Sequence, residues 1–272
     1  MKTNYSIDVL DGLGANIDVQ TRGSDVLRIL PRVNEEVNEE WISDKSRHAF
    51  YGLKKQRLTI PMERAKDGQF KELKWEEALS LAKEKLQRVN PEKIHGRVGQ
   101  FVDVETIVAF KDLLNRINCE NIDVRKDAPD FDCDFRQQYL FNSKIVGLDD
   151  CDLLLLVGVN PKTENPVINA RIRKSKIVNG LEIAVIGSAL NLNYEYTHLG
   201  TTPEELEQLA NGSHPYLARL QSAELPMLVV GSEVFARSDS DAIKEHIKEL
   251  AKNTNLINKQ EQWNGVNVLH RD

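Results

Sequence analysis

Short alternating segments open the chain. Residues 6–9, 16–21 and 26–31 alternate apolar and polar side chains with a period of two, and turns containing glycine separate them. This alternation is typical of strands that bury one face. We therefore predict a small antiparallel β unit over residues 6–32, followed by an acidic turn and a short helix.

From Pro61 onward the pattern changes to alternating helices and strands. Apolar residues recur at helical spacing in segments 75–89 and 104–117, and Asp103 is placed to cap the second segment. The run 153–157 is apolar without a break, as in a parallel strand buried on both faces. Further predicted helices are 132–141, 167–178 with Gly180 at its end, the segment starting at the capping box 202–205, and 239–252; further predicted strands are 97–102, 121–124, 181–187 and 226–231.

This alternation predicts an α/β fold: a small antiparallel β unit followed by a doubly wound, mostly parallel sheet with right-handed crossovers. We expect two domains, a small β domain over residues 1–60 and an α/β domain over residues 61–272. Because such sheets host many chemistries, the fold alone does not predict function.

Composition excludes several classes of function. Among the 272 residues, 40% are apolar and 29% are charged, as in ordinary globular proteins. No apolar run approaches the roughly 20 residues of a membrane span. A net charge of −6 with dispersed Lys and Arg argues against nucleic acid as the main partner. The longest basic cluster, Arg171–Lys176, is interpreted as the solvated face of a helix rather than a phosphate site.

The cysteines do not form a recognisable site. Cys119, Cys133 and Cys151 lack C-x-x-C spacing, and their odd number excludes a complete disulfide framework. A reducing compartment is therefore expected. The first residues resemble neither a signal peptide nor an Arg-rich transit segment, so either a presequence has been removed or the protein is made where it works.

Generic catalytic motifs are also missing from the sequence. The six histidines form no H-x-x-x-H pair, and there is no G-x-S-x-G elbow and no P-loop. The segment Gly12-Leu13-Gly14 precedes a predicted strand rather than a helix. We interpret it as a turn and not as a dinucleotide site.

Three stretches suggest a family: RLTIPMER at 57–64, WEEAL at 75–79 and DLLLLVGVNPKTENPVINARIRK at 152–174. Together they resemble the molybdopterin-dependent oxidoreductases. That family includes a member without molybdenum, the 75-kDa-type iron–sulfur subunit of respiratory complex I.

The family's usual opening is a four-cysteine cluster site with the spacing C-x2-C-x3-C-x27-C-x-K. With Lys45 as the lysine, the four ligand positions fall on Asp8, Asp11, Ala15 and Ser43. An iron–sulfur cluster of this kind needs four thiolates, and none of these side chains contains sulfur. We predict that the site is degenerate and holds no metal, and interpret Asp8 and Asp11 as turn and surface acids.

The molybdenum site of the family is degenerate as well. Active relatives place a Cys, selenocysteine or Ser a few residues before a proline, and the corresponding position here is Lys126, beside Asp127. An ammonium group is not a molybdenum ligand. Cys119 and Cys133 lie off the expected spacing and are interpreted as buried or incidental.

A third departure concerns the cofactor's nucleotide. Where active relatives have D-P-R after the next strand, this chain has Gly187-Ser188-Ala189. The loop containing Gly158, Asn160 and Pro161 is retained at the carboxyl end of a strand, where open α/β sheets bind ligands. We interpret it as a degenerate cofactor loop, kept because the chain needs a tight strand-to-helix turn there. No catalytic residue is expected.

Within the family, five short stretches in order most resemble the mitochondrial-type complex I subunit. Its ferredoxin-like amino-terminal region, which carries the electron-transfer clusters, has no counterpart here. The resemblance implies a non-catalytic structural subunit, or a separately made portion of one, in the peripheral matrix arm at the mitochondrial inner membrane, supporting NADH-to-ubiquinone electron transfer.

The resemblance also implies partners. Other complex I subunits are expected, above all the cluster-bearing half of the same subunit, with the iron–sulfur clusters in that half and no cofactor in this chain. A divided gene is preferred over a processed fragment. Two alternatives stay open: a free molybdopterin- or nucleotide-dependent oxidoreductase, and a separate binding module of the same ancestry.

Overall fold

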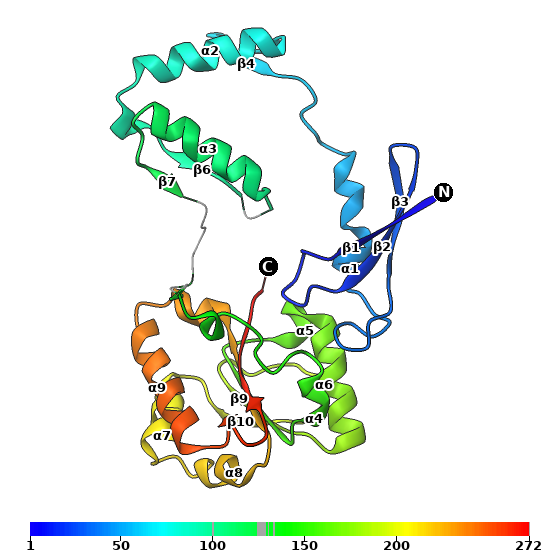
Figure 1. Cartoon of the computed structure of the whole chain (residues 1–272), viewed down its shortest axis with the longest axis vertical. Helices are drawn as coiled ribbons and strands as arrows, with labels where there is room; N and C mark the ends of the chain where they lie inside the picture. The colour runs from blue at the N-terminus through cyan, green and yellow to red at the C-terminus, as the bar shows by residue number, and fades with distance from the viewer. Residues whose placement is uncertain (100, 124–128, 130, 133, 272) are drawn as a thin grey trace. The chain divides into compact units, whose positions relative to one another are not determined.

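The computed structural model describes residues 1–99, 101–123, 129, 131–132 and 134–271. The chain forms two compact units: unit 1 comprises Met1–Phe50 with Ala128–Asp272, and unit 2 comprises Tyr51–Asp127. Figure 1 shows the course of the chain through both. The division into a β domain ending at residue 60 and an α/β domain after it stays a prediction.

Unit 1 begins with a three-stranded antiparallel sheet in the order β1-β2-β3. The strands are β1 (Lys2–Ile7), β2 (Asn16–Arg22) and β3 (Asp25–Pro31), followed by helix α1 (Asp44–His48) and the 3-10 helix η1 (Ala49–Leu53), which enters unit 2. The predicted β unit is therefore confirmed, although β1 begins at Lys2, before its predicted start. Between β1 and β2 the chain turns through Gly14, whose φ of 69° is left-handed. The Gly-x-Gly segment is a turn, as predicted.

The rest of unit 1 is built around a five-stranded parallel sheet in the order β10-β9-β8-β11-β14. Its strands are β8 (Leu153–Val157), β9 (Glu182–Ile186), β10 (Thr197–Gly200), β11 (Pro226–Gly231) and β14 (Val266–Leu269). Every residue of the central strand β8 is buried. The doubly wound parallel sheet predicted from the sequence is confirmed.

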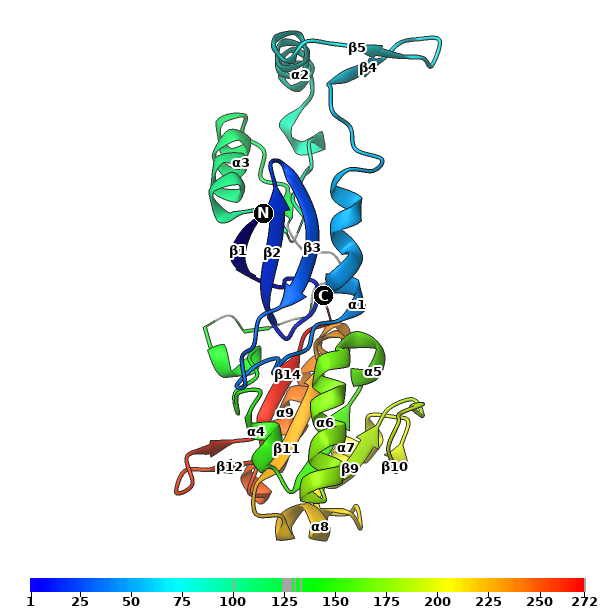
Figure 2. The same cartoon turned by 90° about the vertical axis from the view of Figure 1, so that its right-hand side faces the viewer.

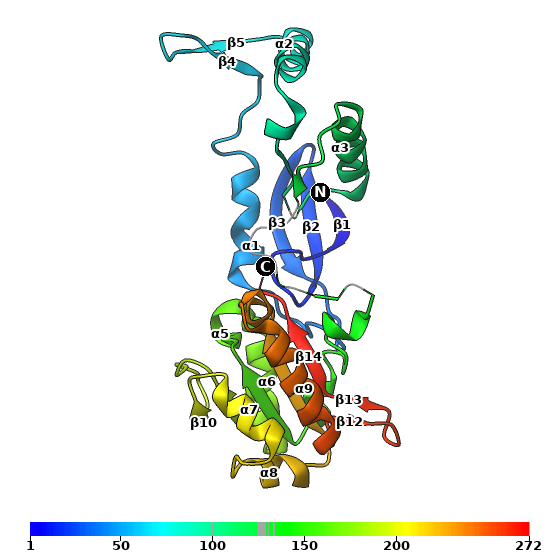
Figure 3. The same cartoon turned by 90° about the vertical axis from the view of Figure 1, so that its left-hand side faces the viewer.

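Helices cover both faces of this sheet. Figure 2 shows α6 in front of it, and Figure 3 shows α7 and α9 in front of the opposite face. The helical segments of this part are α4 (Gly147–Asp150), α5 (Pro161–Glu164), α6 (Pro166–Asn179), α7 (Glu204–Asn211), α8 (Leu217–Ser222) and α9 (Ser240–Asn253), with 3-10 turns η3 (Arg136–Gln138) and η4 (Ser232–Ala236). A short hairpin, β12 (Ile257–Asn258) with β13 (Trp263–Asn264), precedes β14.

The alternation along β8 divides the interior into two cores. Leu154 and Leu156 face α6 together with Leu13 and Ile17 of the β unit. Leu153, Leu155 and Val157 face the side of α7 and α9. The β unit is thus part of one of the two hydrophobic cores rather than an appendage.

Two helix predictions differ from the structure in detail. The segment 132–141 was expected to be a helix, and this is wrong: in its described part only Arg136–Gln138 is helical, as a 3-10 turn. Pairing with β14 replaces the helix there, because Leu140 O accepts a hydrogen bond from Val268 N at 3.0 Å on the outer edge of β14.

The capping box before α7 forms in part: Glu205 accepts hydrogen bonds from the backbone N–H and the hydroxyl of Thr202 at 3.0 and 2.9 Å.

Unit 2 is small and lightly packed. Its elements are the hairpin β4 (Met62–Arg64) and β5 (Phe70–Glu72), α2 (Trp75–Arg88), the 3-10 turn η2 (Pro91–Lys93), β6 (Gly96–Arg97), α3 (Val104–Arg116) and β7 (Ile122–Asp123). Asp103 caps α3 as predicted, accepting from Thr106 N at 2.8 Å. The two predicted strands here reduce to the short parallel pair β6–β7 within the described residues.

Candidate functional site

The four positions predicted to correspond to cluster ligands are all buried. The exposed fractions of Asp8, Asp11, Ala15 and Ser43 are 4%, 9%, 1% and 6%. The two acids lie in the loop after β1 and accept hydrogen bonds from nearby backbone amides. Asp8 accepts from Leu10 N at 3.1 Å, and Asp11 accepts from Leu13 N at 3.0 Å. Turn acids were predicted correctly, but their placement on the surface is wrong, because the loop packs into the core beneath the β unit.

Hydrogen bonds join three of the four positions. Asp8 N donates to Ala15 O at 2.8 Å, which closes the loop. Ser43 is the N-cap of α1 and accepts from Ser46 N at 3.2 Å. The Ser46 hydroxyl lies 2.8 Å from Ser43 Oγ and donates to the Asp8 carboxylate. We call Asp8, Ser43 and Ser46 the polar frame.

Ser46 was not identified from the sequence. It lies three residues after Ser43, where a helix N-cap meets a free backbone N–H, and this spacing is the signal that would have found it. Lys45, the lysine of the family spacing, also forms a hydrogen bond to the loop after β1. Lys45 Nζ donates to Leu10 O at 2.7 Å, between the first two ligand positions.

The side chains at the cluster positions do not fit an iron–sulfur cluster. They supply two carboxylates, one hydroxyl and one methyl group, whereas the cluster needs four thiolates. The hydroxyl and the Asp8 carboxylate are already engaged with Ser46. Among the described residues no group of three or more His, Cys, Asp or Glu side chains is arranged to hold a metal ion.

The loop after β8 is explained by close packing. Gly158 has a left-handed φ of 60°, and a Cβ there would lie 2.4 Å from Val234 Cγ2. Asn160 Oδ1 accepts from Lys162 N at 3.2 Å and caps α5, which begins at the buried Pro161. Close packing and helix capping therefore account for Gly158 and Asn160 whether or not the loop binds a ligand.

Lys126, which the sequence places at the position of the molybdenum ligand, lies outside the described residues, as do its neighbour Asp127 and Cys133. Cys119 is buried, as expected, with 2% exposed and its thiol 3.1 Å from Ile94 O. Cys151 is also buried. Desolvation and the neighbouring charge of Asp152 raise the pKa of the Cys151 thiol to about 12, so it is not a reactive thiolate at neutral pH.

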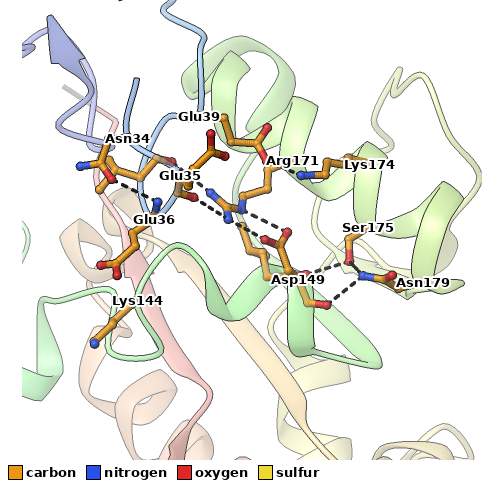
Figure 4. Close-up of polar contacts among 12 residues, drawn as sticks. Asn34, Glu35, Glu36, Glu39, Lys144, Asp149, Arg171, Lys174, Ser175 and Asn179 are labelled. Atoms are coloured by element: carbon orange, nitrogen blue, oxygen red, sulfur yellow. Dashed lines mark hydrogen bonds and ion pairs between the residues drawn. The ribbon is translucent and has the colours of Figure 1, made fainter. Parts of the chain in front are cut away.

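A second set of polar contacts joins α6 to the chain after β3 (Figure 4). Arg171, only 4% exposed, donates to Asp149 Oδ2 at 2.5 Å and to Oδ1 at 3.1 Å. It also donates to Glu35 O at 3.0 Å and to Val37 O at 3.4 Å. We call Arg171, Asp149 and these two carbonyls the polar junction.

Neighbouring contacts reinforce the polar junction. Lys174 forms an ion pair with Glu39, and this bond raises the pKa of Lys174. Ser175 donates to Leu148 O at 2.8 Å. The interpretation of Arg171–Lys176 as a solvated face is therefore wrong for Arg171 and Ser175, which are buried, and right for Arg173, which is exposed.

Both parts of the chain match known protein families. Residues 57–272 match the molybdopterin oxidoreductase family, and residues 1–51 match the NADH-ubiquinone oxidoreductase NDSU1/NuoG-like 4Fe-4S domain. Among solved structures, acetylene hydratase from Pelobacter acetylenicus aligns with a TM-score of 0.45 at 15% identity, over 68% of this chain and 27% of that one. We draw no conclusion from a similarity this low.

Curated relatives match over the length of the chain. The NADH dehydrogenase [ubiquinone] iron-sulfur protein 1, mitochondrial, of Solanum tuberosum is 41% identical over 99% of this chain and 36% of that protein. The NADH-ubiquinone oxidoreductase 78 kDa subunit, mitochondrial, of Neurospora crassa is 44% identical, with 100% of this chain and 37% of that protein covered. The 75 kDa subunit of Reclinomonas americana is 37% identical, with 99% and 41% covered.

The chain thus spans about two fifths of the length of these relatives. The positions predicted for the cluster ligands contain no sulfur, Lys45 contacts Leu10 O, and the parallel sheet of the α/β part is present. With its family match covering residues 57–272, the chain belongs to the molybdopterin oxidoreductase family.

Proposed function

We propose that this chain is a non-catalytic structural part of mitochondrial respiratory complex I. It would be a subunit, or a separately made portion of one, in the peripheral arm on the matrix side of the inner membrane. The names of the relatives, all subunits of an NADH–ubiquinone oxidoreductase, support this proposal. No helix among the described residues is long and apolar enough to cross a membrane.

The observation that carries the non-catalytic part of the proposal is the polar frame. An iron–sulfur cluster in this region would need thiolates at positions 8, 11, 15 and 43; the side chains there are buried and contain no sulfur, and Asp8, Asp11 and Ser43 are engaged in hydrogen bonds. Electrons would then pass through clusters held by the cluster-bearing half of the subunit. This chain would contribute no cofactor and no catalytic residue.

Its contribution would be positional. Electron tunnelling depends on fixed distances between clusters, so a subunit that fixes its neighbours supports electron transfer without taking part in it. The polar junction and the shared core hold the β unit of this chain against α6. A rigid unit of this kind is suited to fixing the positions of other subunits.

Native electrophoresis of gently solubilised mitochondrial membranes tests the proposal. We expect this chain to migrate with the large band that oxidises NADH, detected by activity staining and by an antibody to the chain. Migration near its own mass of 30.9 kDa would refute the complex I assignment. In that case bound pterin or metal in the isolated species would identify a free oxidoreductase instead.

Reconstitution with iron and sulfide tests the loss of the cluster separately. We expect the purified chain to gain no visible charge-transfer absorption and no stoichiometric iron, because it offers no thiolate at the four positions. A variant carrying Asp8→Cys, Asp11→Cys, Ala15→Cys and Ser43→Cys is the matched positive control. Cluster formation in the unmodified chain would contradict the prediction.

A further inference from the structure

A groove is lined by residues of α9, β11 and β14, and α9 covers the face of the sheet that is turned to the viewer in Figure 3. Its volume is about 770 Å³, which is large enough for several side chains. Its apolar lining comes from β11, β14, α9 and the segment before η3: Val230, Val266, Val268, Ile247, Ala251 and Phe131. We call it the α9 groove.

The backbone groups of β14 beside the α9 groove already have hydrogen-bond partners within the chain. Val268 N bonds to Leu140 O at 3.0 Å, and Asn142 Nδ2 donates to Val266 O at 2.6 Å, so the outer edge of β14 is occupied. A partner therefore cannot add a strand there. It must bind through side chains, as a helix does when it lies in a groove.

One rim of the α9 groove is basic. Lys244, Lys248 and Lys252 recur every four residues along α9 and line the groove, together with the single acid Glu245. Lys248 pairs with Glu245 and Lys244 pairs with Asp241 just outside the lining, so these three lysines and two acids leave a net charge of 3 − 2 = +1, in a chain whose net charge is −6. The rim is therefore complementary to a partner with carboxylates.

Large apolar side chains remain exposed beside the groove. Phe135 is 58% exposed and Ile257 is 48% exposed, and both belong to its lining. A small ligand within the groove would leave such side chains in water, whereas a polypeptide lying along it covers them. The exposed rim thus favours a macromolecular partner over a small molecule.

We propose that the α9 groove binds an amphipathic helix of a partner polypeptide, with acidic residues along one edge of that helix. Carboxylates four residues apart on such a helix have the same spacing, about 6 Å, as the lysines on α9. Apolar side chains on its inner face would fill the groove. The inference rests on the proposed function, in which this chain binds other subunits, and names the surface involved.

A labelled peptide tests the inference with the full chain. The probe is a fluorescein-labelled 18-residue peptide with leucines on one helical face and glutamates along one edge, and its control is a scrambled peptide of the same composition. We expect saturable binding by fluorescence anisotropy for the first peptide and at least about tenfold weaker binding for the second.

Substitutions then locate the binding site. Lys248→Glu with Lys252→Glu should weaken binding about tenfold, and the matched control, Arg173→Glu with Lys176→Glu on α6 at the opposite face of the sheet, should leave it unchanged. Ala251→Trp, which fills the groove, should abolish binding while circular dichroism stays unchanged.

Equal binding by all variants, or by the scrambled peptide, would overturn the inference. So would concentration-dependent dimers of this chain that the two lysine substitutions abolish, since a second copy would then occupy the groove. Binding of a fatty acid in place of the peptide would assign the groove to a small amphiphile. Each of these results leaves the electrophoretic test of the proposed function unaffected.

Discussion

The guanidinium of Arg171 is a buried positive charge that donates four hydrogen bonds. It reaches both oxygens of Asp149 and two backbone carbonyls of the chain after β3. A buried charge is tolerated only where partners surround it, and the loss of one partner leaves the others uncompensated. The polar junction therefore stabilises the packing of the β unit on α6 as long as every member is present.

We expect Arg171→Ala to lower the free energy of unfolding by about 3 kcal/mol, because it leaves Asp149 and two carbonyls without their donor. Chemical denaturation measures the change. Arg173→Ala, on an exposed position of the same helix, is the control and should change stability by less than about 0.5 kcal/mol. Equal effects of the two substitutions would show that the polar junction contributes little.

Because of Glu182, at the start of β9, we expect the free energy of unfolding to depend on pH. Burial opposes its ionisation, but bonds from Tyr216 Oη and Arg219 Nε, both at 2.7 Å, outweigh burial and lower its pKa below the ordinary 4.5. Its contribution to stability is therefore full above about pH 4.5 and is lost as the pH falls through the lowered pKa.

Glu182→Gln should accordingly destabilise the chain at neutral pH by up to about 1 kcal/mol, a modest effect because the pair is partly exposed. Its free energy of unfolding should also fall less steeply than that of the unmodified chain between about pH 5 and about pH 3. Denaturation curves across this range measure both. Parallel curves for the two proteins would show that Glu182 has an ordinary pKa.

At the scale of elements, local pattern determined what could be predicted. The unbroken run of β8, the Asp103 cap of α3 and the glycine after α6 were all read correctly, since each depends on residues close in sequence. Gly180 has a left-handed φ of 74°, as a helix-ending glycine should. The fold class followed from these elements in order.

Distant partners explain the errors. Arg171 looks like a surface base in sequence because its acceptors, at Glu35 and Val37, are more than 130 residues away. The helix expected at 132–141 was likewise replaced by contacts with β14. At the positions aligned with the cluster ligands, the degenerate site stays a prediction from spacing, and the burial of Asp8 and the role of Ser46 depend on packing that no local pattern contains.

Gly158 and Gly180 both have a left-handed φ, but only Gly158 is also closely packed. Substituting each by alanine separates the effect of conformation from the effect of packing. Gly180→Ala meets no atom within 4 Å and should cost only the left-handed conformation, about 1 kcal/mol. Gly158→Ala adds a clash with Val234, and we expect a loss of about 3 kcal/mol or more. Thermal or chemical denaturation compares them. Equal losses would indicate that the loop after β8 is not retained for packing.

For the whole molecule, the two units differ in how much apolar surface they bury. Helices α2 and α6 both have 14 residues, yet α6 contains six buried residues and α2 contains none. In α2, Trp75 is 68% exposed and Leu79 is 63% exposed. Helices gain most of their stability from packing, so unit 2 should be the less stable part of the isolated chain.

Hydrogen exchange followed by mass spectrometry should reveal this difference. We expect amides of α2 to exchange about a hundredfold or more faster than those of α6 in the isolated chain, because their openings need less energy. If the chain is part of a larger assembly, α2 should gain protection within it while α6 changes little. Similar exchange rates in the two helices of the isolated chain would contradict the expectation.

The polar frame has a consequence for how the protein matures. A domain ligated by a metal cannot finish folding until that metal is delivered, so its synthesis is tied to the supply of the ion. In this chain hydroxyl and carboxylate groups link Asp8 to Ser43 through Ser46, and a backbone hydrogen bond links Asp8 to Ala15; all of these groups are present from the moment of translation. If the chain holds no cluster, as proposed above, its β unit should fold in iron-starved cells, and oxygen damage that destroys iron–sulfur clusters should leave it intact.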